Sequence, residues 1–188
     1  MDRRVRKTKA LLRQGLAQLM QTKNLRDITV RELADLVDIN RGTFYIHYKD
    51  IYDMIGQIEE EMFEEFDTLI RHHTIDELQK GDTLLFTDLC DYMAKNADMC
   101  IPLLGENGDP SFVFRMKKLV RTKCLDEYMK IFHKGEDNTF DYYYAFVVSG
   151  CLELFKEWLR KGMPESPEEM SRLTSQIVMD GLANLEKI

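Results

Sequence analysis

Residues 29–50 read TVRELADLVDINRGTFYIHYKD, and this stretch decides the fold of the region around it. Its opening pattern, Thr29-x-x-Glu32, is a capping box, in which a hydroxyl and a carboxylate satisfy exposed backbone N–H groups at the start of a helix. Residues 38–40, Asp-Ile-Asn, form a tight turn, and the asparagine is suited to cap a further helix over 41–48. The stretch therefore predicts two short helices joined by a tight turn.

A longer helix is predicted ahead of this pair, over residues 4–22, because leucines and a methionine recur there on one helical face. A long helix followed by two short helices around a turn is the arrangement of a helix-turn-helix unit. In such units the second helix of the pair enters the major groove of DNA. We therefore expect a DNA-binding domain over residues 1–49, with its motif at about 29–48.

The side chains of residues 41–49 suit contact with DNA. Arg41 can reach a phosphate or a guanine edge, and Gly42 lets the backbone approach closely. Phe44 and Tyr48, four residues apart, are expected to pack inward at least in part. Taken singly these features are common, since capping boxes open many helices and aromatic runs more often belong to a core. Together they predict the following DNA contacts: Thr29, Arg31, Asn40, Arg41, Gly42, Thr43, Tyr45, His47, Tyr48 and Lys49.

The charge distribution supports the same interpretation. The whole chain has a net charge of −7, which by itself argues against a nucleic-acid partner. Residues 1–50, however, hold 11 Lys and Arg against 6 Asp and Glu, so the acidic excess lies entirely in the remainder. A basic head on an acidic body is expected when only one end of a protein meets phosphate.

Residues 29–50 resemble the TetR family of regulators, whose pattern is a Thr-opened helix, a short turn and an R-G-T-x-Y-x-H-aromatic recognition helix. The strong match covers about residues 8–55, and residues 150–170, GCLELFKEWLRKGMPESPEEM, are similar to the C-terminal pattern of one subgroup. One departure is Ile51, which stands where the family usually has a phosphate-binding lysine; Lys49 is a candidate substitute. The matching residues are Ala34, Arg41, Gly42, Thr43, Tyr45, His47 and Tyr48.

The rest of the chain also predicts helices, because apolar residues recur at helical spacing and strand-like alternation is absent. The expected fold is all-α, with the N-terminal three-helix DNA-binding domain followed by a helical regulatory and dimerisation domain over 50–188. Gly162 and Pro164 end one helix, and Ser166-Pro167 open the last. Helices are predicted at about 51–73, 83–96, 98–105, 110–134, 139–161 and from 167 to near the end.

The resemblance implies that the second domain dimerises through its last two helices. The residues agree, because the helix from 139 is apolar over much of its circumference and must be covered on more than one side. The alternative is that this surface is only core within one chain. The predicted dimer interface comprises Tyr144, Val147, Cys151, Leu154, Trp158, Leu173, Ile177 and Gly181.

The resemblance also implies that the second domain often holds an effector. A methionine and aromatic stripe at helical spacing is more often plain core, and this alternative stays open. The candidate lining of an apolar cavity comprises Phe86, Met93, Met99, Phe112, Met116, Tyr128 and Phe146.

Other classes of protein find little support. No Ser-His-Asp pattern, Gly-rich phosphate loop or pair of catalytic carboxylates appears, so we expect neither an enzyme nor a cofactor. The four cysteines form no C-x-x-C pair, which predicts buried free thiols and no metal site. No run of about 18 apolar residues is present, and glutamines interrupt the N-terminal apolar segment, so we expect a cytoplasmic protein without membrane contact.

These observations lead to one hypothesis with an alternative. The chain is expected to be a TetR-like repressor that binds a palindromic operator on double-stranded DNA as a homodimer and is released by a small apolar effector. The alternative is a TetR-like coactivator or regulator controlled by a protein partner, whose docking surface would be the acidic body and the loops at 74–82 and 105–110.

Overall fold

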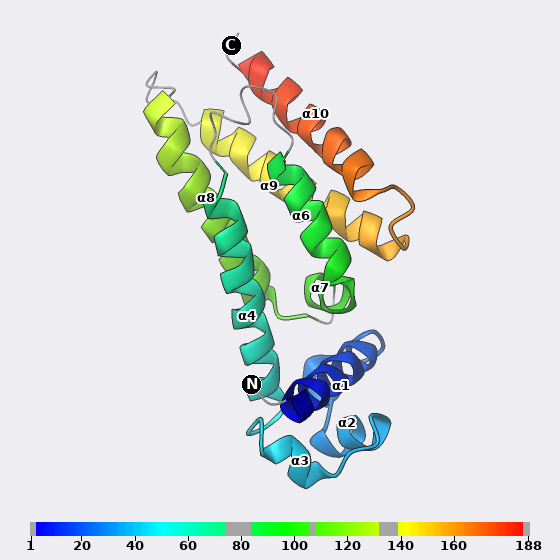
Figure 1. Cartoon of the computed structure of the whole chain (residues 1–188). Coiled ribbons are helices and arrows are strands. Elements are labelled where there is room, and N and C mark those ends of the chain that lie inside the picture. The colour runs from blue at the N-terminus through cyan, green and yellow to red at the C-terminus, as the bar shows by residue number, and fades with distance from the viewer. Residues whose placement is uncertain (1–2, 74–83, 106–107, 132–138, 186–188) are drawn as a thin grey trace. The chain divides into compact units, whose positions relative to one another are not determined.

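The computed structural model describes residues 3–73, 84–105, 108–131 and 139–185, and the side chains of 3–73, 84–105, 108–123 and 141–180. The described chain is helical and holds no strand (Figure 1), so the all-α prediction is confirmed, with helix ends close to those expected. No described helix has the length and apolar character needed to cross a bilayer. The elements are α1 (Arg3–Met20), η1 (Leu25–Asp27), α2 (Val30–Leu36), α3 (Arg41–Tyr45), α4 (Ile51–Arg71), α6 (Leu84–Lys95), α7 (Ala97–Leu104), α8 (Pro110–Ile131), α9 (Thr139–Arg160) and α10 (Pro167–Leu185).

The helices form two compact units. The first unit comprises Met1–Phe63 and Asn96–Val113, and the second comprises Glu64–Lys95 and Phe114–Ile188. The segment predicted as the DNA-binding domain, residues 1–49, therefore lies within the first unit, together with the start of α4 and with α7.

Side-chain caps fix where the short helices of the first unit begin. The Thr29 hydroxyl accepts a hydrogen bond of 3.2 Å from the Glu32 N–H, which confirms the predicted helix start. The Asn40 side chain accepts a bond of 2.7 Å from the Gly42 N–H at the start of α3. Between them, Asp38 takes a left-handed conformation with φ of 53°, which turns the chain from α2 into α3. Because these bonds are local, they could be predicted from a few neighbouring residues.

Apolar side chains of α1, α2, α3, α4 and α7 are buried in the first unit, where α1 packs against both α2 and α7. Within this unit α1 and α2 approach each other closely at Gly15, where an added Cβ would lie 2.4 Å from Cγ1 of Val37. A side chain at this position would therefore force α2 away from α1. The largest fully buried side chains of this core include Leu12, Leu16, Met20, Leu33, Phe44 and Met54.

In the second unit, α10 packs along α6, and the hydroxyls of Thr87 and Ser171 lie 2.8 Å apart across this contact. The end of α9 is set by Gly162, whose φ of 79° ends the helix, and by the Met163 N–H, which donates to the Trp158 carbonyl at 2.9 Å. The predicted end of this helix is thereby confirmed.

The start of α10 is a reciprocal capping box. The Ser166 hydroxyl accepts from the Glu169 N–H at 3.2 Å, and the Glu169 carboxylate accepts from the Ser166 N–H at 2.9 Å. Just before it, the Trp158 indole N–H donates to the Glu165 carbonyl at 3.0 Å. These bonds hold the turn between α9 and α10 in one conformation.

Candidate nucleic-acid interface

The helix α3 is anchored to the first unit by two aromatic side chains. Phe44 is fully buried, and its ring lies 5.6 Å from that of Tyr48, measured between centroids. The α-helix ends at Tyr45, earlier than predicted, but the N–H groups of His47 and Tyr48 still donate to the Phe44 carbonyl at 2.9 and 3.0 Å. Hydrogen bonding is therefore continuous over residues 41–48, and one face of this segment is buried in the core.

The opposite face of this segment is available to a partner. Arg41, Gly42, Tyr45 and Lys49, all predicted DNA contacts, are exposed, while Thr43 and His47 are partly exposed. Sequence reasoning missed Ile46, which lies among them and is highly exposed. An apolar residue in a short helix is normally assigned to the core, which is why the pattern alone gave no sign of its position.

Tyr48 is a correction to the predicted contacts. Its side chain is only 5% exposed, and the Lys9 ammonium lies 5.3 Å from the centroid of its ring. Burial, with a smaller contribution from nearby carboxylates, raises the pKa of Tyr48 to about 12, so its hydroxyl stays protonated. Tyr48 therefore holds α3 against α1, and its match to the family pattern reflects packing.

Three further predicted contacts have structural partners of their own. The Asn40 side chain is engaged in the cap of α3, so it sets where that helix begins. The Thr29 hydroxyl accepts a bond within α2 but keeps its own hydrogen for donation. The Arg31 guanidinium is exposed and lies 3.7 Å from the Asp35 carboxylate, a surface pair too weak to hold it away from a phosphate.

The start of α4 shows how Ile51 and the nearby Lys49 are placed. Ile51 is buried in the core of the first unit, so this position cannot contact DNA. Lys49 is exposed two residues earlier. Its backbone N–H donates to the Asp53 carboxylate at 2.8 Å, a bond that lowers the pKa of Asp53, and the Asp53 N–H donates to Asp50 at 2.8 Å. These bonds fix the backbone that carries the Lys49 side chain.

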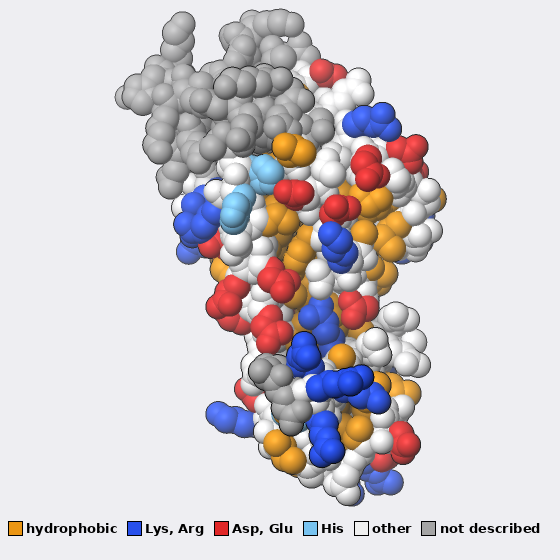
Figure 2. Space-filling model, in the orientation of Figure 1, with side chains coloured by type: hydrophobic (Ala, Val, Ile, Leu, Met, Phe, Trp, Pro, Cys, Tyr) orange, Lys and Arg blue, Asp and Glu red, His pale blue; other side chains and the backbone are white. Residues whose placement is uncertain are grey.

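Basic side chains gather on the first unit. Figure 2 shows lysine and arginine side chains over the face of this unit that carries α1. The N-terminal turns of α1 supply Arg3, Arg4, Arg6, Lys7 and Lys9, which account for much of the basic excess of residues 1–50. Positive charge beside the exposed face of residues 41–49, called the recognition segment below, is the electrostatic footprint of a phosphate-binding surface.

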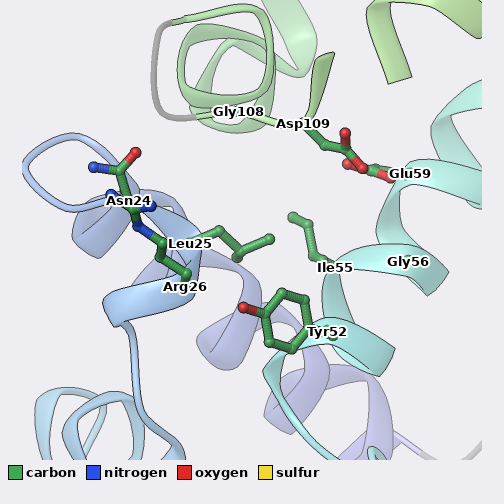
Figure 3. A pocket seen from close by; sticks show the side chains of 9 residues that line it. All are labelled: Asn24, Leu25, Arg26, Tyr52, Ile55, Gly56, Glu59, Gly108 and Asp109. Atoms are coloured by element: carbon green, nitrogen blue, oxygen red, sulfur yellow. The ribbon is translucent and has the colours of Figure 1, made fainter. Parts of the chain in front are cut away.

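A hollow of about 510 Å³ lies elsewhere in the first unit, between residues 24–26, α4 and residues 108–109 (Figure 3). Leu25 and Ile55 point toward each other across it, and Glu59 and Asp109 add carboxylates to its lining. None of the residues predicted to line an effector cavity belongs to this hollow.

The predicted cavity residues are divided between the two units. Met99 and Phe112 are buried in the first unit, and the other described members lie in the second. Phe146 is a correction, because its side chain is 75% exposed and so does not belong to an enclosed lining. Phe86 and Met93 are buried and Met116 is half-buried, whereas the side chain of Tyr128 lies outside the described residues.

On α9, the row of side chains that is exposed to solvent differs from the row predicted for the dimer interface. Most of the predicted row is half-buried in the chain's own unit, and the Tyr144 hydroxyl donates to the Lys117 carbonyl at 3.1 Å. Trp158 is only 2% exposed and has no surface left for a partner. The exposed row is instead Tyr142, Phe146 and Gly150, spaced four residues apart.

On α10, the predicted interface residues Leu173 and Ile177 are exposed, one turn apart. The predicted Gly181 lies outside the residues whose side chains are described. In the part of the chain that the structure describes, α9 and α10 thus each present large apolar side chains to solvent. Such surface favours contact with another molecule.

Three of the four cysteines are described, and all are free thiols. Burial raises the pKa of Cys90 and of Cys100 to about 12 and that of Cys151 to about 11. At neutral pH these thiols are protonated and therefore poor nucleophiles.

The chain is similar to known transcriptional regulators. Residues 83–180 match the family model TetR_C_8, a transcriptional regulator C-terminal region. A 55-residue match, 29% identical, links the chain to the uncharacterized HTH-type transcriptional regulator YxbF from Bacillus subtilis; it covers 29% of this chain and only 14% of the relative.

Two solved structures are similar over nearly the whole chain. A TetR transcriptional regulator from Streptococcus agalactiae has a TM-score of 0.61 and 22% identity, covering 94% of this chain and 96% of its own. The transcriptional regulator FadR from Bacillus subtilis, in complex with stearoyl-CoA, has a TM-score of 0.62 and 13% identity, covering 92% of this chain and 98% of its own.

Proposed function

Because the chain belongs to the TetR family of transcriptional regulators, we propose that it acts as a repressor that binds a palindromic operator as a homodimer and leaves it when an effector binds the second unit. The observation that carries this proposal is the two-sided segment 41–49, where Phe44 and Tyr48 are buried while Arg41, Tyr45 and Lys49 are exposed. A short helix that is held in the core by one face and exposes basic and polar side chains on the other has the form of a major-groove recognition helix.

In the proposed complex, phosphates are held by the basic start of α1, by Lys49 and by Arg31 at the start of α2, whose helix N-terminus also favours a phosphate. Arg41 and Thr43 then face base edges in the major groove. Gly42, which carries no side chain, lets the backbone of α3 come close to DNA. The phosphate contacts supply affinity and the base contacts supply sequence preference.

The homodimer is proposed to form through the exposed rows of α9 and α10. Tyr142, Phe146 and Gly150 on α9, with Leu173 and Ile177 on α10, would pair with the same residues of a second copy around a two-fold axis. Gly150 leaves open space where another residue would place its Cβ, so a partner helix could approach closely. Two recognition helices then meet successive major grooves about one DNA turn apart.

An apolar effector in the second unit is the remaining element. The stearoyl-CoA complex of the FadR relative supports an acyl chain as the ligand class, and the apolar side chains Phe86, Met93 and Met116 are our proposed lining. Acyl-CoA thioesters of a series of chain lengths should raise the melting temperature of the protein in a thermal-shift assay. In a separate binding assay they should release the protein from DNA. If no thioester does either, the effector proposal fails and control by a protein partner becomes the better hypothesis.

The DNA-binding proposal is tested by selecting bound sequences from a random DNA pool and measuring affinity for the selected operator over a range of salt concentrations. We expect a palindromic site and a steep loss of affinity with salt. Lys49→Ala should weaken binding to all sequences alike and reduce the salt slope by about one per subunit.

The matched control is Lys95→Ala in α6, another exposed lysine, which should leave both affinity and slope unchanged. Arg41→Ala should additionally relax the preference at one position of the selected site. Absence of salt-dependent binding to any sequence would contradict the proposal.

A further inference from the structure

Ile46 is 77% exposed, the highest value among the large apolar side chains that the structure describes. Its backbone remains helical, with φ of −67° and ψ of −27°, and its N–H donates to the Gly42 carbonyl at 3.3 Å. The direction of the side chain is therefore set by helical backbone geometry.

Helical geometry places Ile46 at the outermost point of the recognition segment. It stands two residues from Phe44 and two from Tyr48, about 200° of helical turn from each. Because both aromatics are buried, Ile46 points directly away from the core of the first unit. It is thus the side chain that would enter a groove ahead of the others.

The surroundings of Ile46 leave its apolar surface open. Side chains of a helix lean toward its N-terminus, so Ile46 leans over Gly42, one turn earlier. Gly42 has no side chain, and a Cβ added there would lie 3.2 Å from the side-chain oxygen of Asn40. Polar residues flank this row on both sides, with Arg41 and Tyr45 on one and Thr43 on the other.

We propose that Ile46 contacts the C5-methyl group of a thymine in each half-site of the operator and so selects thymine at that position. The inference rests on the proposed function. Among the four bases, thymine is the one that offers a methyl group in the major groove. An isoleucine placed against phosphates or base polar edges would strip them of water without replacing hydrogen bonds, whereas against a methyl group it removes apolar surface from water on both sides.

Deoxyuridine substitution tests this contact, because it removes only the methyl group and keeps every hydrogen-bonding atom of the base. Each thymine of the selected operator is replaced in turn, and the dissociation constant of the full-length protein is measured. One thymine per half-site should be sensitive, with about a fourfold loss of affinity for one half-site and about fifteenfold for both.

The variant Ile46→Ala should bind the uracil and thymine operators equally, because it lacks the side chain that is proposed to contact the thymine methyl group. Thr43→Ser removes the methyl group of the other methyl-bearing side chain within residues 41–49 and should keep the uracil sensitivity. DNA binding without any uracil-sensitive thymine, or sensitivity that persists in Ile46→Ala, overturns the inference and leaves the proposed function standing. Failure of the wild-type protein to bind DNA overturns both.

Discussion

Replacing Phe146 by glutamate is expected to leave the protein monomeric and to weaken its binding to a palindromic operator by about 10²–10⁴-fold. Phe146 is the centre of the exposed row of α9, with Tyr142 and Gly150 one turn to either side. In a two-fold interface each copy contributes the same patch, so one substitution introduces two buried carboxylates without partners. A monomer then binds half-sites singly and loses the gain that comes from linking two recognition helices.

The mass of the protein in solution, from light scattering or sedimentation, and its operator affinity provide two separate measurements. Phe114→Glu is the matched control, because Phe114 on α8 is a 68% exposed phenylalanine of the same unit that lies outside the proposed interface. It should remain dimeric and bind the operator normally. A dimeric Phe146→Glu variant would show that the rows on α9 and α10 are not the interface.

The limits of sequence reasoning are visible on α9 itself. This helix is apolar over so much of its circumference that periodicity could not choose between the row through Tyr144 and the row through Phe146. The choice is made by contacts distant in sequence, such as the bond from Tyr144 to the carbonyl of Lys117 on α8. Such contacts depend on where another helix lies, and the spacing of residues within α9 does not indicate the position of α8.

Helix starts, in contrast, were predictable, because their hydrogen bonds join residues two or three positions apart. The caps at Thr29 and Ser166 are of this kind. The recognition segment falls between the two cases. Its existence follows from the caps, and the four-residue spacing of Phe44 and Tyr48 correctly predicted that both rings pack inward. The additional assignment of Tyr48 to DNA and the omission of Ile46 both followed from residue type, since a tyrosine can reach a phosphate and an isoleucine is normally assigned to the core.

Replacing Phe44 by alanine is expected to destabilise the first unit by about 3–5 kcal/mol, the usual cost of truncating a fully buried phenylalanine. A loss of this size is a large part of the stability of a small folded unit. Urea unfolding followed by circular dichroism measures it. The truncation leaves a void beneath α3 and removes the ring that Tyr48 contacts, so DNA binding should be lost together with folded structure.

Tyr45→Ala is the matched control, since Tyr45 is the adjacent aromatic residue and is 58% exposed. It should change the free energy of unfolding by no more than about 0.5 kcal/mol, the usual range for surface substitutions, while still weakening operator binding. The two variants thus distinguish the buried face of α3, which supports stability, from the exposed face, which is proposed to bind DNA. If Phe44→Ala kept full stability and lost only DNA binding, Phe44 would belong to the contact surface, and the orientation of the recognition segment on which the thymine contact of Ile46 depends would be wrong.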